Sequence, residues 1–187
     1  MADEAAARDP SQDPRIERTR AHVLNHARKL LSSEGPNAVT YSELAARARV
    51  TRQTLYRHWP TREALIVDLV LDQSMAGMPD GTGTPEQIVG EFLRRMRDDL
   101  GDPDYSAPLV AVIAQAHHEP ASRCALAQVV AGVRGALNAL LEPAGRCVTP
   151  DDYSRLCGPV VFGRVIARET ISDEFIDDLV AAWSQRS

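Results

Sequence analysis

Three consecutive residues, Thr51, Arg52 and Gln53, have side chains that can form hydrogen bonds with nucleic-acid bases. An arginine guanidinium can donate to guanine O6 and N7 together, and a glutamine amide can pair in the same way with adenine N6 and N7. Each such pair is worth roughly 1–3 kcal/mol of discrimination between bases. When this segment begins a helix, the first helical turn carries side chains that can contact base edges.

The distribution of charge favours a phosphate-bearing partner for the same region. The whole chain carries −5, but residues 15–63 contain ten Arg or Lys side chains against four Glu side chains. That segment therefore carries +6, and the remainder of the chain carries −11. A basic segment joined to an acidic body is typical of a phosphate-facing domain attached to a separate sensing or assembly domain.

The segments before Thr51 must position it, and their signals are helical. Apolar residues recur at helical spacing from Pro14, and Gly35 followed by Pro36 should end that first helix. The run Thr40-Tyr41-Ser42-Glu43 predicts a capping box, in which the Thr40 hydroxyl caps the Glu43 amide and Glu43 reaches back. A short second helix follows this cap.

Two further caps complete the local pattern. Thr51 is expected to cap a third helix to about His58, and Thr61 a fourth helix to about Ser74. The second and third helices are then only two or three residues apart. This close connection is typical of a helix-turn-helix.

The rest of the chain also has helical periodicity, after a loop-like stretch at Met78–Thr84 that is a candidate domain boundary. Pro159 should kink the helix that contains it. The expected helices are Glu86–Leu100, Ala107–His117, Ala121–Leu141, Thr149–Glu169 and a last one capped by Ser172. The prediction is therefore an all-α protein.

Composition excludes several classes of site. Three cysteines without a C-x-x-C pair favour reduced thiols in a helical core over a disulfide framework or a zinc site. Adjacent histidines point to different faces of a helix, so His117 and His118 are a poor metal site. No apolar run approaches the roughly 18 residues that span a bilayer, and the N-terminus has no targeting pattern. We therefore expect a cytoplasmic protein with no metal, no cofactor and no membrane partner.

Residues 39–65, VTYSELAARARVTRQTLYRHWPTREAL, resemble the DNA-binding signature of the TetR family of transcriptional regulators. The resemblance implies an N-terminal three-helix helix-turn-helix domain, linked by a fourth helix to a C-terminal helical ligand-binding and dimerisation domain. The implied division is a disordered tail at residues 1–13, a DNA-binding domain at 14–60 and a ligand-binding and dimerisation domain at 61–187. The sequence departs from the family at Arg49, where Gly is usual. A residue other than glycine in the left-handed conformation costs about 1 kcal/mol.

The resemblance and the helix-turn-helix geometry together assign DNA-contacting residues. Thr51, Arg52 and Gln53 should contact bases, because the first turn of the second helix of such a pair enters the major groove. The start of the preceding helix favours phosphates through its free amides and dipole. The expected phosphate contacts are Thr40, Tyr41, Ser42, Thr54, Tyr56, His58 and Arg62.

The pattern in the C-terminal region indicates its functional residues less specifically, since apolar residues at such spacing are usually core. The candidate ligand-pocket residues are Phe92, Met96, Ile113, His117, Val133 and Phe162. The last two helices are expected to pack against their copies as a four-helix dimer bundle. The candidate dimer residues are Val160, Gly163, Phe175, Leu179 and Trp183.

The predicted function is a regulator, usually a repressor in this family, that binds a palindromic operator as a homodimer and is released by a small molecule. One alternative keeps the fold as a helical small-molecule-binding protein that regulates no promoter. A helical enzyme is the other alternative. No G-x-S-x-G, P-loop, G-x-G-x-x-G or H-E-x-x-H motif and no catalytic residue supports it.

Overall fold

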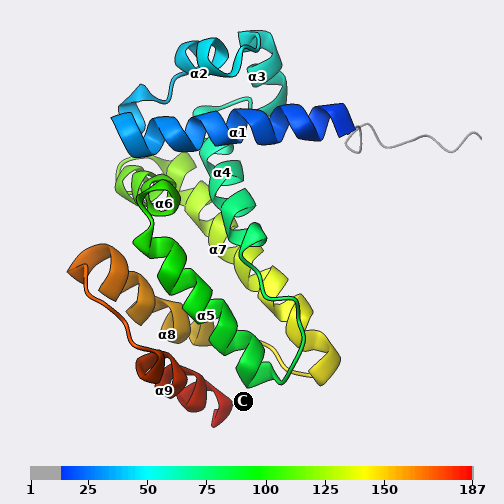
Figure 1. The fold of residues 1–187 in the computed structure, drawn as a ribbon, viewed down its shortest axis with the longest axis vertical. Coiled ribbons are helices and arrows are strands. Elements are labelled where there is room, and N and C mark those ends of the chain that lie inside the picture. Colours follow the sequence, from blue (N-terminus) through cyan, green and yellow to red (C-terminus); the bar gives the residue numbers. More distant parts are fainter. Residues whose placement is uncertain (1–13, 187) are drawn as a thin grey trace, which may run out of the picture.

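The structure, a computed structural model, describes residues 14–186, and these residues form helices and no strand (Figure 1). The predicted disordered tail at residues 1–13 lies outside the described residues. The α-helices are α1 (Pro14–Glu34), α2 (Tyr41–Ala48), α3 (Arg52–His58), α4 (Arg62–Ala76), α5 (Pro85–Gly101), α6 (Pro103–Ala116), α7 (Pro120–Leu141), α8 (Pro150–Val161) and α9 (Asp173–Ser184). The short helices are the 3-10 turns η2 (Pro36–Ala38) and η3 (Glu142–Ala144) and the π-helix η4 (Phe162–Ala167).

Hydroxyl caps explain where most of these helices begin. In each, a Thr or Ser side chain accepts a hydrogen bond from the backbone amide three residues later, which satisfies an otherwise unpaired donor. The predicted capping box at Thr40 is only half formed, because the Glu43 carboxylate accepts from Arg47 at 2.6 Å instead of reaching back. The capping residues are Thr40, Thr51, Thr61, Thr84, Thr149 and Ser172.

The N-terminal helices form one packed unit. Figure 1 shows α1 lying across the base of α2 and α3, with α4 descending from this unit into the rest of the molecule. Apolar side chains from all four helices meet between them and exclude solvent. The largest fully buried residues of this core are Leu24, Leu30, Leu44, Leu55, Trp59 and Leu65.

Helices α4 to α9 form what we call the body, residues 61–186, and α4 also packs with the N-terminal unit. In Figure 1, α4 and α7 run side by side, α5 crosses the centre, and α8 and α9 lie on the opposite side of α5 from α7. Leu93 of α5, Leu137 of α7 and Trp183 of α9 are completely buried in the core that results. The body core therefore joins helices that are far apart in the sequence.

Helix α6 begins earlier than predicted, at Pro103 rather than Ala107, and contains Pro108. Proline has no N–H, so the Asp104 carbonyl loses its normal helical donor four residues later. The buried Gln73 side chain of α4 supplies a replacement, since its Nε2 donates to the Asp104 oxygen at 3.1 Å. A side chain from another helix thus allows the proline within α6.

The helix from Pro150 changes pitch after the predicted kink at Gly158 and Pro159. It continues as an α-helix to Val161 and then widens into the π-helix η4. Arg168, left-handed at φ 56°, ends this segment before the predicted Glu169.

Candidate nucleic-acid interface

The turn between α2 and α3 has the predicted left-handed residue. Arg49 lies at φ 53° and ψ 42° and closes α2. The side chain of Arg49 is exposed. From α1, His22 Nε2 donates to the Ala48 carbonyl at 3.1 Å and holds the turn from below. The departure from glycine therefore puts a strained, positively charged residue at the surface between the two helices.

Thr51, Arg52 and Gln53 are all exposed at the start of α3. The Thr51 oxygen accepts from the Thr54 amide at 3.1 Å, and the hydroxyls of Thr51 and Thr54 lie 2.9 Å apart. One hydrogen bond between two hydroxyls uses one proton, so the pair keeps a second proton for an outside acceptor. The first turn of α3 thus presents a guanidinium, an amide and a hydroxyl donor on one exposed surface.

A hollow of about 370 Å³ adjoins this surface, and we call it the cradle. The α2 N-terminus opens into it, so the helix dipole adds partial positive charge beside two arginines. Such a site favours an anion. Its lining residues are Asn37, Val39, Thr40, Tyr41, Ser42, Arg52, Tyr56 and Arg62.

Most of the predicted phosphate contacts therefore lie together, and Asn37 was missed. Asn37 belongs to the 3-10 turn before α2, and an asparagine there, just before a helix cap, was the available signal. Thr40 and Ser42 are exposed at the start of α2, and Tyr56 is 53% exposed on α3.

Tyr41 does not fit its predicted role. Its hydroxyl donates to the Trp59 carbonyl at 2.6 Å, which uses the single proton that a phosphate would need. The ring packs edge-on against Tyr56, and burial raises the pKa of Tyr41 to about 12. Tyr41 therefore joins the start of α2 to the end of α3. The structure corrects the prediction of a phosphate donor.

Two other predicted phosphate contacts, Arg62 and His58, make contacts within the protein. Arg62 Nε donates to the Val39 carbonyl at 3.1 Å, and its side chain still lines the cradle. His58 Nε2 is buried without a hydrogen-bond partner, and its ring packs on Trp59. The Nε2 atom of His58 is therefore screened from a phosphate, which corrects the prediction for that atom.

Helix α4 is fastened to the N-terminal unit by shared carboxylates. Asp68 accepts from Trp59 Nε1 at 2.8 Å and from Arg20 Nε at 3.0 Å. One turn later, Asp72 pairs with Arg28 at 3.5 Å and with Arg20 at 3.8 Å. The first turns of α4 therefore move with α1 and with the end of α3.

The body contains a cavity of about 210 Å³, which we call the body cavity. Three of the six predicted pocket residues, Met96, Ile113 and Val133, line it. The other lining residues, which periodicity alone did not indicate, are Val70, Ser74, Leu100, Tyr105, Leu109, Leu126, Val129, Val130, Tyr153, Cys157 and Val161.

The remaining candidate pocket residues, Phe92, His117 and Phe162, do not line this cavity. Phe92 is buried beside the cavity wall, where its ring lies 6.4 Å from that of Tyr153. His117 is exposed at the end of α6, and Phe162 is 60% exposed on η4. Apolar spacing alone did not distinguish a cavity wall from packed core or from outer surface.

The structure also corrects the predicted dimer residues. Val160 and Trp183 are completely buried within one protomer, and Gly163 packs against Ile171 of its own chain. These residues have no surface to offer a second copy, whereas Phe175 is 42% exposed and Leu179 is half-buried. The outer surface of the last helices is formed instead by Phe162, Ile166, Phe175 and Leu179.

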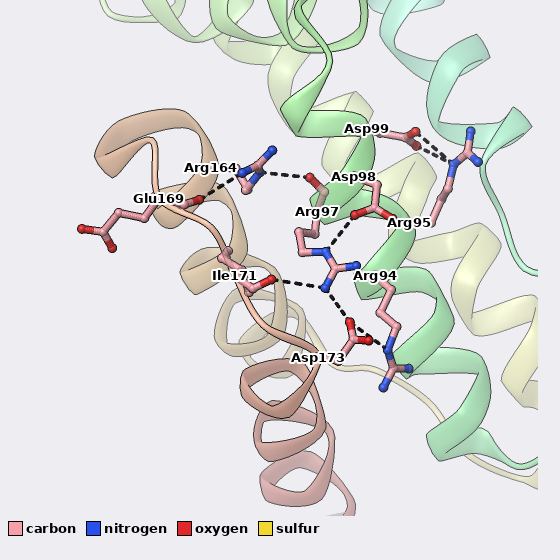
Figure 2. A network of polar contacts seen from close by, with 9 residues as sticks. All are labelled: Arg94, Arg95, Arg97, Asp98, Asp99, Arg164, Glu169, Ile171 and Asp173. Atoms are coloured by element: carbon pink, nitrogen blue, oxygen red, sulfur yellow. Dashed lines mark hydrogen bonds and ion pairs between the residues drawn. The ribbon is translucent and has the colours of Figure 1, made fainter.

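A polar network holds this surface in place (Figure 2). Arg164 of η4 donates to the carbonyls of Arg97, at 3.2 Å, and Glu169, at 3.0 Å. Arg97 of α5 in turn donates to the Ile171 carbonyl at 3.2 Å and to Asp173 at 2.5 Å. The connection from η4 to α9 is therefore bound to α5 through side chains that reach backbone carbonyls.

Two remaining expectations concern cysteines and membranes. Cys157 is buried, but Cys124 and Cys147 are exposed, so only one thiol belongs to the core as predicted. One helical stretch, Pro120–Ala144, is long and apolar enough to cross a membrane by length and composition alone, which does not contradict the expectation. Its buried side, with Val129 and Leu137, packs within the body against helices that include α4 and α6. Residues 14–186 contain no group of three or more metal-ligating side chains.

Comparison with known proteins agrees with this arrangement. Residues 23–69 match the family of bacterial regulatory proteins called the tetR family. A curated relative, the uncharacterized HTH-type transcriptional regulator YdeS of Bacillus subtilis, is 35% identical over 77 residues. That alignment spans 41% of this chain and 39% of the relative.

Solved structures resemble nearly the whole chain. The TetR family transcription regulator SCO0332 is 26% identical, with a TM-score of 0.69 over 90% of this chain and 98% of its own. A putative TetR-family regulator from Mesorhizobium loti, 20% identical, gives 0.62 over 93% and 98%. The multidrug binding protein EbrR complexed with ethidium, 18% identical, gives 0.63 over 88% and 97% and shows the fold alone. Residues 23–69 are therefore similar to bacterial regulatory proteins of the tetR family, and the fold of the described chain resembles that of TetR-family regulators.

Proposed function

We propose that this protein is a cytoplasmic transcriptional repressor that binds a palindromic operator as a homodimer and leaves it when a small molecule binds the body. The observation that carries the proposal is the exposed surface of Thr51, Arg52 and Gln53 on α3, beside the basic cradle. Bases would be contacted by α3 and phosphates by the cradle, which are the two kinds of contact that a specific DNA interface combines. The proposed role requires no catalytic residue, metal, cofactor or membrane.

Dimerisation is assigned to the outer face of η4 and α9. Phe162, Ile166 and Phe175 are 60%, 66% and 42% exposed, and large apolar side chains grouped on one face favour a protein contact. A two-fold contact through this face would pair two DNA-binding units and match a palindromic site. An Ile166→Glu variant should sediment as a monomer. Gln128→Glu, at an exposed position of α7, adds the same single negative charge away from this face and serves as the control.

Coupling between ligand and DNA is assigned to α4. Asp68 and Asp72 of α4 face α1, whereas Val70 and Ser74, each two residues further along, line the body cavity. A ligand that moves α4 therefore moves the carboxylates to which Arg20 and Trp59 are bound. A tenfold preference of the ligand for the DNA-free state would weaken operator binding by about 1.4 kcal/mol.

The test is selection of binding sites from random duplex DNA by the purified wild type. Enrichment of a two-fold-symmetric site, relaxed or lost in Arg52→Ala/Gln53→Ala, is expected. A matched control, Arg155→Ala/Gln185→Ala, changes the same residue types at exposed positions of the body and should select the wild-type site. Affinity for that site should also fall steeply with salt.

The body cavity is the observation that favours the alternative, a helical ligand-binding protein without a promoter. A folded, ligand-free dimer that enriches no sequence would refute the repressor and favour this alternative. Enrichment that is unaffected by the Arg52→Ala/Gln53→Ala change would refute the assignment of α3 to the bases.

A further inference from the structure

The body cavity is small, partly open to solvent and lined by side chains of α4 to α8. Ile113 and Val130 line it and are also 40% and 43% exposed, so they stand at its mouth, between α6 and α7. A dry cavity of about 150 Å³ accepts benzene, so the 210 Å³ here corresponds to roughly eight to ten non-hydrogen atoms. A molecule with a single ring and one short substituent fits this volume.

The lining contains no Asp, Glu, Lys, Arg or His side chain. Its polar groups are the hydroxyls of Ser74, Tyr105 and Tyr153 and the Cys157 thiol. Burial raises the pKa of Tyr105 and Tyr153, and it raises the pKa of Cys157 to about 12, so all four are neutral at pH 7. Arg134, Arg95 and Asp99 influence the pKa of these tyrosines from outside the lining, but none of them contacts the cavity. An ionised ligand would therefore lose its hydration without a directly paired counter-charge, which is unfavourable.

The polar groups are unequally satisfied. The Tyr105 hydroxyl and the Ser74 hydroxyl lie 3.1 Å apart and bond each other. The Tyr153 hydroxyl, on a residue only 9% exposed, has the Cys157 thiol as its partner. Sulfur is a weak hydrogen-bond acceptor, so Tyr153 is the donor that gains most from a ligand oxygen.

We propose that the body cavity binds a neutral single-ring molecule and that the Tyr153 hydroxyl donates to a hydroxyl or carbonyl oxygen on it. This inference deepens the proposed function by naming the chemical class of the effector, and only its consequence for DNA rests on that function. The apolar lining favours binding of the ring, and the lack of a charged side chain in the lining disfavours binding of ions. The hydrogen bond from Tyr153 orients the substituent.

The first test is calorimetric titration of purified protein, without DNA, with three probes that share one ring skeleton. These are 4-methylbenzyl alcohol, 4-methylbenzoate and 4-methylbenzylammonium, which at pH 7 are neutral, anionic and cationic. The alcohol should bind, and both ions should bind at least tenfold more weakly, about 1.4 kcal/mol. Failure of the alcohol to bind up to its solubility limit, or equal binding of either ion, overturns the proposal.

Variants locate the contact. Tyr153→Phe should weaken binding of the alcohol about five- to tenfold, the loss expected for one hydrogen bond, and leave binding of p-xylene within about twofold. Equal losses for both probes would overturn the role of Tyr153. Val130→Trp, at the exposed mouth where the fold tolerates bulk, should block both probes. Unchanged binding in that variant would overturn the location.

Operator selection on the ligand-free protein separates this inference from the proposed function. Binding of the alcohol without any DNA specificity would support the cavity's ligand class and refute the repressor. DNA specificity without binding of the alcohol would overturn the ligand class and support the repressor.

Discussion

The hydrogen bond from Gln73 to Asp104 predicts a measurable coupling between two residues that are distant in sequence. Pro108 removes the amide that would bond the Asp104 carbonyl within α6, and Gln73 Nε2 replaces it at 3.1 Å. Replacing Gln73 with Met, which keeps a similar volume, should leave that carbonyl unpaired. Replacing Pro108 with Ala should restore a helical donor at position 108 and make Gln73 dispensable.

The magnitude follows from what each change removes. An unpaired polar group costs roughly 1–3 kcal/mol when fully buried, and the part-buried bond to the Asp104 carbonyl belongs at the lower end of that range. The Gln73→Met single variant also removes Gln73 Oε1, which is buried without a partner, so the net loss in that variant is smaller. Because the Oε1 contribution is present in both backgrounds, a double-mutant cycle cancels it. We expect a coupling free energy of about 1 kcal/mol between Gln73→Met and Pro108→Ala.

Urea unfolding of the four proteins, followed by circular dichroism, measures this coupling. In the Pro108→Ala background, Gln73→Met should be neutral or stabilising. In the wild-type background it should be less favourable by about 1 kcal/mol, equivalent to roughly 2–4 °C in Tm. Losses that add within about 0.3 kcal/mol would refute the reasoning. They would mean that the Asp104 carbonyl does not depend on Gln73.

Three other changes test the turn, one histidine and the thiols. Arg49→Gly should raise the free energy of unfolding by roughly 0.5–1 kcal/mol, because the relieved left-handed strain exceeds the added freedom of the unfolded chain. The same change should weaken DNA binding. A lower free energy of unfolding in urea would contradict this prediction. Desolvation, then the charges of nearby basic residues, lowers the folded pKa of His26 below 6.5, so its neutral form stabilises the fold. That contribution is present above about pH 6.5 and is lost as pH falls through the folded pKa. The decrease in the urea midpoint between pH 7 and pH 5 should therefore be smaller in His26→Gln than in the wild type. An unrelated surface variant should show the same decrease as the wild type. Iodoacetamide at pH 8 should label Cys124 and Cys147 in the native protein and Cys157 only after unfolding; mass spectrometry showing rapid native labelling of Cys157 would refute its burial.

Local signals predicted the helix-turn-helix because each signal is read within a few residues of the chain. The hydroxyl caps at Thr40, Thr51 and Thr61 lie where the sequence places them, and so does the left-handed Arg49. Each of the three caps depends on a backbone amide three residues later. The early start of α6 was missed because its proline is compensated by Gln73, which is distant in sequence and has no local signature.

The functional residues divide along a different line. Sequence can assign a hydroxyl or a guanidinium to a segment, but it cannot say which partner takes the proton. Tyr41 matched a phosphate-contacting position and instead donates to Trp59, whereas its neighbour Ser42 stays exposed. The two lie side by side in one predicted capping box. Only their orientation on α2 separates a residue that holds the helix pair together from one that faces the cradle.

The same ambiguity governs the body, where residues of one type serve three purposes. Val133 lines the cavity, Val160 is packed in the core and Ile166 faces outward, although all three recur at helical spacing. Periodicity identifies the helix and its apolar residues, but the identity of the helix that covers each face is a property of the whole fold. In this protein the covering helices come from distant parts of the chain, such as α5, which packs against α8 and α9. A dimer surface and a ligand cavity therefore become distinguishable only when the protomer core is known, because the core determines which apolar residues remain for a partner or for a ligand.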